Sequence, residues 1–426
     1  MVELLTISIN ALRSFLLLLP LAAAAADDVE TEFGGHSKTR GLADVYSDNS
    51  LFHPLTGSRS SSLETELRLN FSASKNDWAF DTAWQLYGAW GDRVELMRSL
   101  PGVSLPGFSN LPTDDRRLMN LTDTLRDDGK FAAVHRLDRL SVTYATDNLV
   151  VRAGRQAITW GNGLVFSPMD IVNPFDPTAV DTEYKAGDDM VYAQYLLSNG
   201  DDVEFAQVFR RDPASGDRGS AVNTTAIKYH GMIGDSEYDL LVADSYSDTT
   251  IGVGGNRSVG GAVVHGDLVW VDSIDGSKFQ LVANISYSWV WGGKNVSGLI
   301  EYYFNEFGQA SGRYDLASLS QNTALLNRLQ RGETFTVGRH YLAGGLAVEM
   351  TPLWMLTPNL FANLEDRSAL LQIVSRNSLS DNAEVLAALN LPIGPSGSEF
   401  GGIEAGMPNI YLSSDLAVFA QFAFYF

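Results

Sequence analysis

Apolar and polar residues alternate along most of this chain. In residues 62–72, Leu63 and Leu67 belong to one set of alternate positions, whereas Glu64 and Arg68 belong to the other. A period of two is that of a β-strand with one apolar and one polar face, because successive side chains point to opposite sides of the sheet. The pattern therefore predicts an all-β protein. The same alternation returns in residues 78–88, 279–289 and 415–426.

Candidate strands follow one another through the chain and number about 18, which is even. Many of them run for about ten residues, whereas strands of globular proteins usually have about five or six. Ten residues suit a strand that crosses a bilayer at a tilt. Residues 33–46 and 248–254 alternate least clearly, so a count of about 16 stays possible. The candidates are residues 33–46, 62–72, 78–88, 136–146, 149–158, 188–198, 202–211, 220–230, 235–245, 248–254, 259–270, 277–291, 295–305, 338–350, 354–365, 368–378, 383–393 and 415–426.

The links between candidate strands are mostly short on one side and often long on the other. Short periplasmic turns and long outer loops are typical of outer-membrane barrels, whose sheet must close because lipid leaves no backbone group unpaired. We therefore predict a transmembrane antiparallel up-and-down β-barrel with both termini on the short-turn side. A soluble all-β protein is the alternative. The long links are residues 89–135, 159–187, 306–337 and 394–414.

The N-terminus is typical of an exported protein. Arg13 precedes the apolar run FLLLLPLAAAAA at residues 15–26, which is too short to cross a bilayer as a helix. We expect residues 1–26 to be a cleaved signal peptide and residues 27–426 to form one barrel domain. A short buried helix is the alternative. The net charge of −21 argues against binding to nucleic acid, and the absence of cysteine excludes disulfides and thiolate metal sites.

Residues 159–187 are unusual because they combine Gly and Pro with many apolar side chains. Irregular backbone is not tolerated against lipid, and exposure to water would leave a large apolar patch. We expect this loop to fold into the lumen as a constriction, since a ring of this size is too wide for wall side chains to fill. The alternative is a cap that packs on neighbouring loops. The expected constriction residues are Trp160, Asn162, Phe166, Asp170, Asn173, Phe175, Asp176 and Asp181.

Alternation also assigns charged residues to the inner face of the barrel. Acidic residues outnumber basic ones there, which predicts a mild cation preference or a mixed polar lumen. The alternative is that these charges pair across neighbouring strands. Arg155 is expected to hold Asp170 or Asp176, or to meet an anionic solute. The expected inward residues are Glu64, Glu66, Asp81, Asp239, Asp267, Glu301, Glu349, Glu365 and Glu384 among the acids, and Arg68, Arg139, Arg152, Lys228, Arg339 and Arg376 among the bases.

Two short segments carry a resemblance to known barrels. The terminal FAQFAFYF, which ends at Phe426, resembles the C-terminal signal of Gram-negative outer-membrane proteins, and residues 159–187 resemble the constriction loop of porins. RAGRQAITWGNG at residues 152–163 resembles a segment of the alginate-export family, whose barrels also have about 18 strands. Alginate is not carried over as a substrate, because this lumen is not rich in arginine. The resemblance implies the cell outer membrane, its lipids and lipopolysaccharide, the barrel-assembly machinery through Phe426, and a homotrimer or a monomer.

We therefore expect a channel for passive or substrate-selective diffusion of small polar solutes. The alternatives are a transporter for hydrophobic or bulky solutes and a scaffold barrel around a partner. We expect no enzyme, cofactor or metal: the six His lack metal spacing, and His265 with Asp267 has no evident serine. The Gly-rich residues 252–261 are expected to form a flexible turn, and residues 272–276 a hairpin turn.

Overall fold

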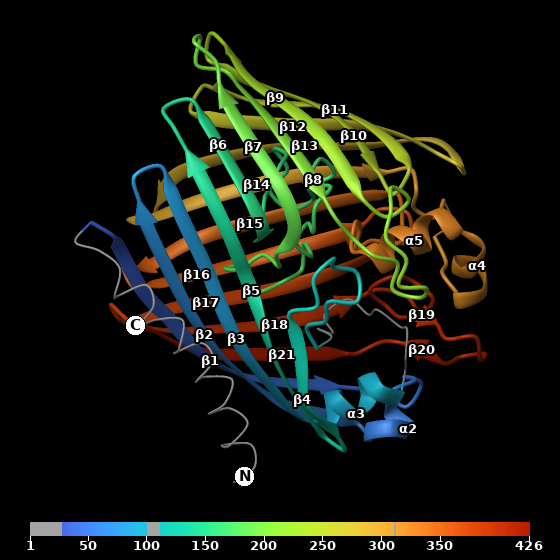
Figure 1. Ribbon diagram of the computed structural model, residues 1–426. Coiled ribbons are helices and arrows are strands. Elements are labelled where there is room, and N and C mark those ends of the chain that lie inside the picture. The colour runs from blue at the N-terminus through green and yellow to red at the C-terminus, as the bar shows by residue number, and fades with distance from the viewer. Residues whose placement is uncertain (1–27, 100–110, 311) are drawn as a thin grey trace.

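A closed β-barrel forms the body of the protein. The computed structural model describes residues 28–99, 111–310 and 312–426, so the predicted signal peptide at residues 1–26 lies outside them. Among the described residues, 18 strands form an antiparallel ring, closed where β21 pairs with both β18 and β1 (Figure 1). The predicted up-and-down barrel is confirmed. The ring strands are β1 (Glu30–Val45), β2 (Arg59–Lys75), β3 (Trp78–Gly91), β5 (Phe131–Ala145), β6 (Leu149–Gln156), β7 (Asp188–Leu196), β8 (Asp202–Val208), β9 (Thr224–Ile233), β10 (Ser236–Ser245), β11 (Asp248–Val259), β12 (Ala262–Ser273), β13 (Gly276–Trp291), β14 (Lys294–Asn305), β15 (His340–Thr351), β16 (Trp354–Asn363), β17 (Ser368–Ser380), β18 (Ala383–Ile393) and β21 (Leu416–Tyr425).

The two faces of the wall follow the alternation of the sequence. On β14, Ile300 is 58% exposed, whereas its neighbour Glu301 is fully buried. The register places Glu301 opposite Asn284 on β13 and Ala343 on β15, which keeps one polar stripe on the inner side. The outer side is apolar around the ring. Exposed outward residues include Ile227, Leu240, Val242, Ile251, Ile285, Leu360, Val418 and Phe422.

The two ends of the barrel differ. Among the described residues, one end carries tight turns together with the start of β1 and the end of β21, and the other carries the long connections (Figure 1). In the described part of the chain, no helix is long and apolar enough to cross a membrane. The long-loop end holds α2 (His53–Thr56), α3 (Asp92–Ser99), α4 (Leu316–Gln321), α5 (Thr323–Arg331) and the small hairpin of β19 (Ile403–Glu404) and β20 (Tyr411–Leu412).

Two expectations about local structure need correction, and a third is confirmed. The Gly-rich segment 252–261 is not a turn for most of its length, because β11 continues through it to Val259. Arg339 and Glu365 lie in connections next to β15 and β16 rather than on the strands themselves. The hairpin turn expected at residues 272–276 is present, between the end of β12 and the start of β13.

One further strand, β4 (Thr122–Asp128), was not predicted. It pairs with Phe131–Arg136 of β5, whereas β6 pairs only with Leu140–Ala145 of the same strand. Thus β4 pairs with the part of β5 that extends beyond the end of β6. Just before β4, Arg117 forms an isolated bridge to Arg210, beyond the end of β8. The segment 111–128 therefore completes the wall at the long-loop end beside β6 and β7.

Candidate functional site

The connection between β6 and β7, residues 157–187, crosses the inside of the ring. Its atoms bond to inward side chains from strands on opposite sides of the barrel, including β1, β8, β14 and β17. The segment has no regular strand or helix, and its prolines and glycines explain why. We call residues 157–187 the internal loop.

The first part of the internal loop is held by acidic residues of the wall. The indole nitrogen of Trp160 donates to Glu204 Oε2 on β8 at 2.8 Å. The amide nitrogen of the Asn162 side chain donates to Asp239 on β10 and to Asp267 on β12, both at 2.9 Å. Glu204 and Asp239 also contact Lys228, so these carboxylates are satisfied by the wall and the loop together.

Glu301 is the main anchor of the loop tip. Its carboxylate accepts backbone N–H groups of Leu164 at 2.7 Å, Val165 at 3.2 Å and Phe166 at 2.6 Å. The ring of Phe166 stacks on Tyr303, with ring centroids 4.6 Å apart. Three successive backbone donors use most of the acceptor capacity of this carboxylate. Glu301 therefore fixes the loop and is not free to attract a passing cation.

A glycine of the wall makes room for side chains that hold the loop. A Cβ atom on Gly254 of β11 would lie 2.0 Å from Asp267 Oδ1 and 2.9 Å from the Asn162 side-chain nitrogen. Only a glycine leaves space for this hydrogen bond beside the strand. The Gly-rich sequence of β11 thus serves packing of the internal loop.

The middle of the loop buries its own charges. Lys185 Nζ donates to Asp170 Oδ2 at 2.6 Å, and both side chains are buried. Burial raises the pKa of Asp170 to about 6, although the charge of Lys185 opposes that rise. Asp176 caps its own turn by accepting from the backbone and hydroxyl of Thr178, and burial raises its pKa as well. Asn173 has a positive φ of 52°, which asparagine tolerates better than most residues.

The returning part of the loop is acidic and meets a basic stretch of wall. Asp181 Oδ2 accepts from Lys38 Nζ at 2.7 Å and from Arg40 at 3.0 Å, both on β1. Burial alone would raise the pKa of Asp181, but the hydrogen bond and charge of Lys38 hold it below the usual range. The Tyr184 ring lies 4.3 Å from the guanidinium of Arg68 on β2. The loop thus donates hydrogen bonds to an acidic residue on one side of the ring and accepts them from basic residues on another.

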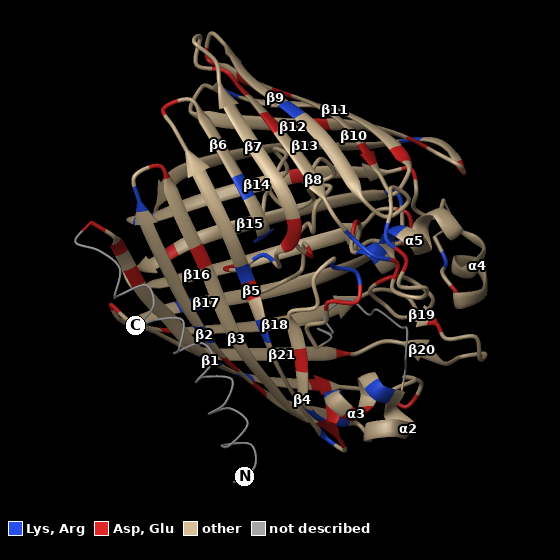
Figure 2. Ribbon diagram, viewed as in Figure 1, with Lys and Arg blue, Asp and Glu red and all other residues tan. Residues whose placement is uncertain are grey.

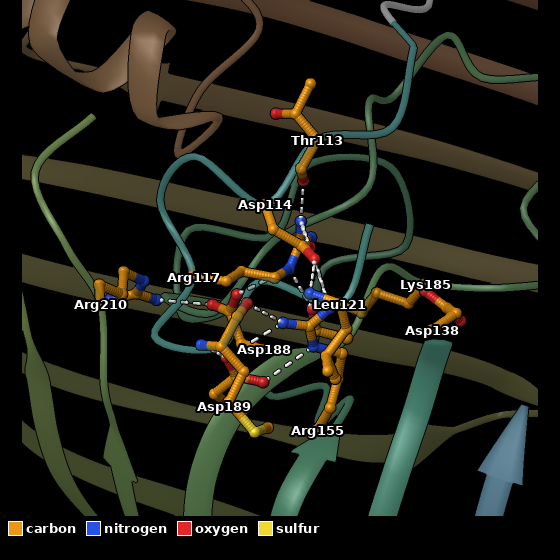
Figure 3. A network of polar contacts seen from close by, with 12 residues as sticks. Thr113, Asp114, Arg117, Leu121, Asp138, Arg155, Lys185, Asp188, Asp189 and Arg210 are labelled. Atoms are coloured by element: carbon orange, nitrogen blue, oxygen red, sulfur yellow. Dashed lines mark hydrogen bonds and ion pairs between the residues drawn. The ribbon is translucent and has the colours of Figure 1, made fainter. Parts of the chain in front are cut away.

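Arg155 lies in a different environment from the one that we expected. It is fully buried and bonds to Asp189 at 2.8 Å and to Asp114 at 2.9 Å, not to Asp170 or Asp176 (Figure 3). Asp189 is its direct partner in the β6–β7 register, and Asp114 comes from the segment that completes the wall behind these strands. Arg155 therefore joins the base of the internal loop to the preceding outer connection.

Most of the expected lumen charges have partners on neighbouring strands. Glu66 accepts from His36, Arg40 and Gln85, and Lys228 contacts Glu204 and Asp239. This agrees with the alternative of cross-strand pairing. Of the remaining expected residues, Arg68 and Arg139 bond to Asp138, Arg152 to Thr143, Glu349 to Asn295, Arg339 to Gly308 O, and Arg376 to Glu384, and Asp81 lies opposite Ser72 and Ser141.

Several partners were missed by reasoning from the sequence. Asp138 was overlooked because it sits at a register shift between β3 and β5, where simple alternation fails. Asp189 lies on β7 and Asp114 in the connection before β4, and nothing in the sequence marks either as a partner of Arg155. Lys38 and Arg40 do alternate on β1, and that alternation was a usable signal. Among the described residues, no group of three acidic or His side chains could hold a metal ion.

Comparison with known proteins identifies a fold. No protein-family model matches the chain. No curated protein matches it either. Among solved structures it is similar to OccAB3 of Acinetobacter baumannii, with a TM-score of 0.52, 8% identity, and coverage of 93% of this chain and 99% of that one. A BenF-like porin from Pseudomonas fluorescens Pf-5 gives a TM-score of 0.51 at 10% identity, with coverage of 94% and 99%. The fold is that of porin barrels.

Proposed function

We propose that the protein is a channel for diffusion of small polar solutes, with the internal loop as its constriction. The observation that carries this proposal is the loop itself, bonded to Glu301 on one side of the ring and to Lys38 and Arg40 on the other. The porin-type fold supports the same interpretation. Solutes would pass beside the loop, which sets the size limit, and no residue needs to perform chemistry.

The outward face supports a location in a membrane. Apolar side chains cover it around the ring, as lipid requires, and tight turns at one end suit the periplasmic side. We place the barrel in the outer membrane of a Gram-negative bacterium, in contact with its lipids and lipopolysaccharide, after removal of residues 1–26. A monomer and a homotrimer are both compatible with this outer face.

Single-channel recording in a planar bilayer tests the function. The refolded protein should give stable open steps, and a salt gradient should give a reversal potential that reports its preference among ions. A silent bilayer from protein shown to be folded would contradict the proposal. It would favour the two alternatives, a transporter for hydrophobic solutes or a scaffold barrel.

A cleft beside the internal loop gives little support to the hydrophobic-solute alternative. Phe166, Phe175 and Phe335 line it together with three prolines, but Ser167, Glu333, Thr334 and Thr336 line it as well. Its volume is about 20 Å³, which is close to the space that one water molecule needs. A solute with even one ring would have to displace the loop to enter.

A further inference from the structure

Three arginines converge on one carboxylate in the wall beside the internal loop. Asp138 on β5 accepts from Arg68 at 2.8 Å and from Arg139 at 2.6 Å, and Arg136 Nη2 lies 3.1 Å from its Oδ1. Guanidinium groups stay protonated in proteins, so one negative charge faces three positive ones. This excess is notable in a chain with a net charge of −21. Figure 2 shows Lys and Arg positions in blue on β5 and β6.

Arg136 is the least satisfied member of this cluster. It is 4% exposed, yet its Nε and Nη2 have no hydrogen-bond partner within residues 28–99, 111–310 and 312–426. The contact of Nη2 with Asp138 is close in distance but lacks hydrogen-bond geometry. A buried donor without an acceptor is costly, and an unseen ion or water is a common reason for one.

The nearby carboxylates already hold other arginines. Asp114 and Asp189 bond to Arg155, and Asp188 bonds to Arg210 at 3.1 Å (Figure 3). Arg136 therefore shares its one close carboxylate, Asp138, with Arg68 and Arg139.

We propose that Arg136, with Arg68 and Arg139, binds a small anion: a carboxylate or an inorganic oxyanion. Such anions match the planar fork of a guanidinium, which presents parallel N–H donors. Arg139 is 20% exposed and donates to the carbonyl oxygen of Lys185 in the internal loop at 2.5 Å. An anion in the lumen can thus approach the cluster along Arg139, next to the constriction. The inference goes beyond the proposed function, because occupancy can be measured without any transport.

Isothermal titration of the refolded protein in an uncharged detergent tests the site. The probes are inorganic phosphate and acetate, each added in a low-salt buffer, because salt screens the attraction. Wild type should bind at least one probe saturably, and R136Q should bind it at least about tenfold more weakly, since charge-assisted hydrogen bonds are lost. The matched control is R376Q, because Arg376 lies on the inner face, 53% exposed and paired with Glu384.

The outcomes separate the two proposals. Equal affinity in R136Q, or no saturable binding of either probe to wild type, would overturn the anion site even if the barrel conducts. Saturable binding that R136Q weakens, together with a silent bilayer, would overturn only the channel. If R136Q fails to refold, R136K serves instead: it keeps the charge but loses the fork, so binding should weaken while the fold persists.

Discussion

At the scale of single residues, Glu301 illustrates how a wall carboxylate can be structural. A charge in a lumen is readily interpreted as part of an ion path. Here the same group accepts three successive backbone N–H groups of the loop tip and one side-chain amide, that of Asn284. Each bond to a charged acceptor contributes roughly 1.5–3 kcal/mol. Its effect on permeation is therefore expected to act through the loop.

We predict that E301A detaches the tip of the internal loop. The three N–H groups lose their acceptor, so single-channel steps should become larger and noisier than in wild type. E349A is the control, since Glu349 lies on the same face and accepts from the exposed Asn295 amide rather than from the loop. Equal conductance of wild type and E301A would show that Glu301 does not hold the tip.

Glu399, in the connection after β18, gives the molecule a pH-sensitive contact. It accepts from Tyr341 at 2.5 Å, Asn363 at 2.8 Å and the backbone of Val337 at 3.0 Å. Burial raises the pKa of Glu399 to about 7, and these hydrogen bonds lower it only in part. A raised carboxyl pKa means that the packed state binds the proton more tightly than the free chain does. Its contribution to packing is therefore greatest in acid and is lost as the pH rises through about 7.

We predict that residues 394–402 progressively lose protection from hydrogen exchange as the pH rises from about 4.5 to about 7, after correction for the intrinsic rate. E399Q keeps the shape of the side chain without the charge, so its protection should stay constant over that interval. A fall of the same size in E399Q would assign the pH dependence to another group.

At the scale of elements, strands and loops differ in how far the sequence could predict them. The ring strands were predictable because alternation is a local signal that a two-faced wall imposes on every strand. The strand β4 carries polar residues at both sets of positions in TDTLRDD, so it left no such signal. The loop's anchors were not predictable, because Asn162 and Asp267 meet only through the closed ring. Counting the charges of the inner face likewise could not show whether Glu301 accepts hydrogen bonds from the loop or faces the open lumen.

The packing of the internal loop against β11 can be tested by substituting Gly254. We predict that G254A breaks the bond between Asn162 and Asp267, because the new methyl group would lie 2.0 Å from Asp267 Oδ1. Conductance should then shift toward that of E301A. G41A is the control, since a methyl group at Gly41 of β1 meets nothing within 4 Å. Unchanged conductance in G254A would mean that the wall adjusts at little cost.

At the scale of the whole molecule, the seam between the first and last strands closes the barrel. Gly35 donates to Phe426 O at 2.8 Å, and Phe426 donates back to Gly35 O at 3.0 Å. A closed ring removes the unpaired edges that a membrane would not tolerate. Phe426 therefore has a structural role, besides the recognition by the barrel-assembly machinery that the resemblance of the C-terminal segment implies.

These two roles predict different results for two variants. Deletion of Phe426 removes both backbone bonds. It should lower the yield of folded protein in detergent, and it should lower the amount of folded protein in cells several-fold. F426A keeps the backbone bonds and loses only the ring. If the ring is a recognition signal, F426A should refold normally in detergent but accumulate poorly in the outer membrane. Normal accumulation of F426A in cells would contradict recognition through this residue.

The reach of the internal loop also sets an order of events during folding. Its partners extend from Lys38 on β1, through Glu204 and Glu301, to Gln372 on β17, so they come from nearly the whole length of the chain. They come together only when the ring has closed. Contacts between residues so distant in sequence form late, because chain entropy opposes them until the ring brings them close. A newly closed barrel should thus pass through a short-lived state in which the ring is complete and the loop is still unseated.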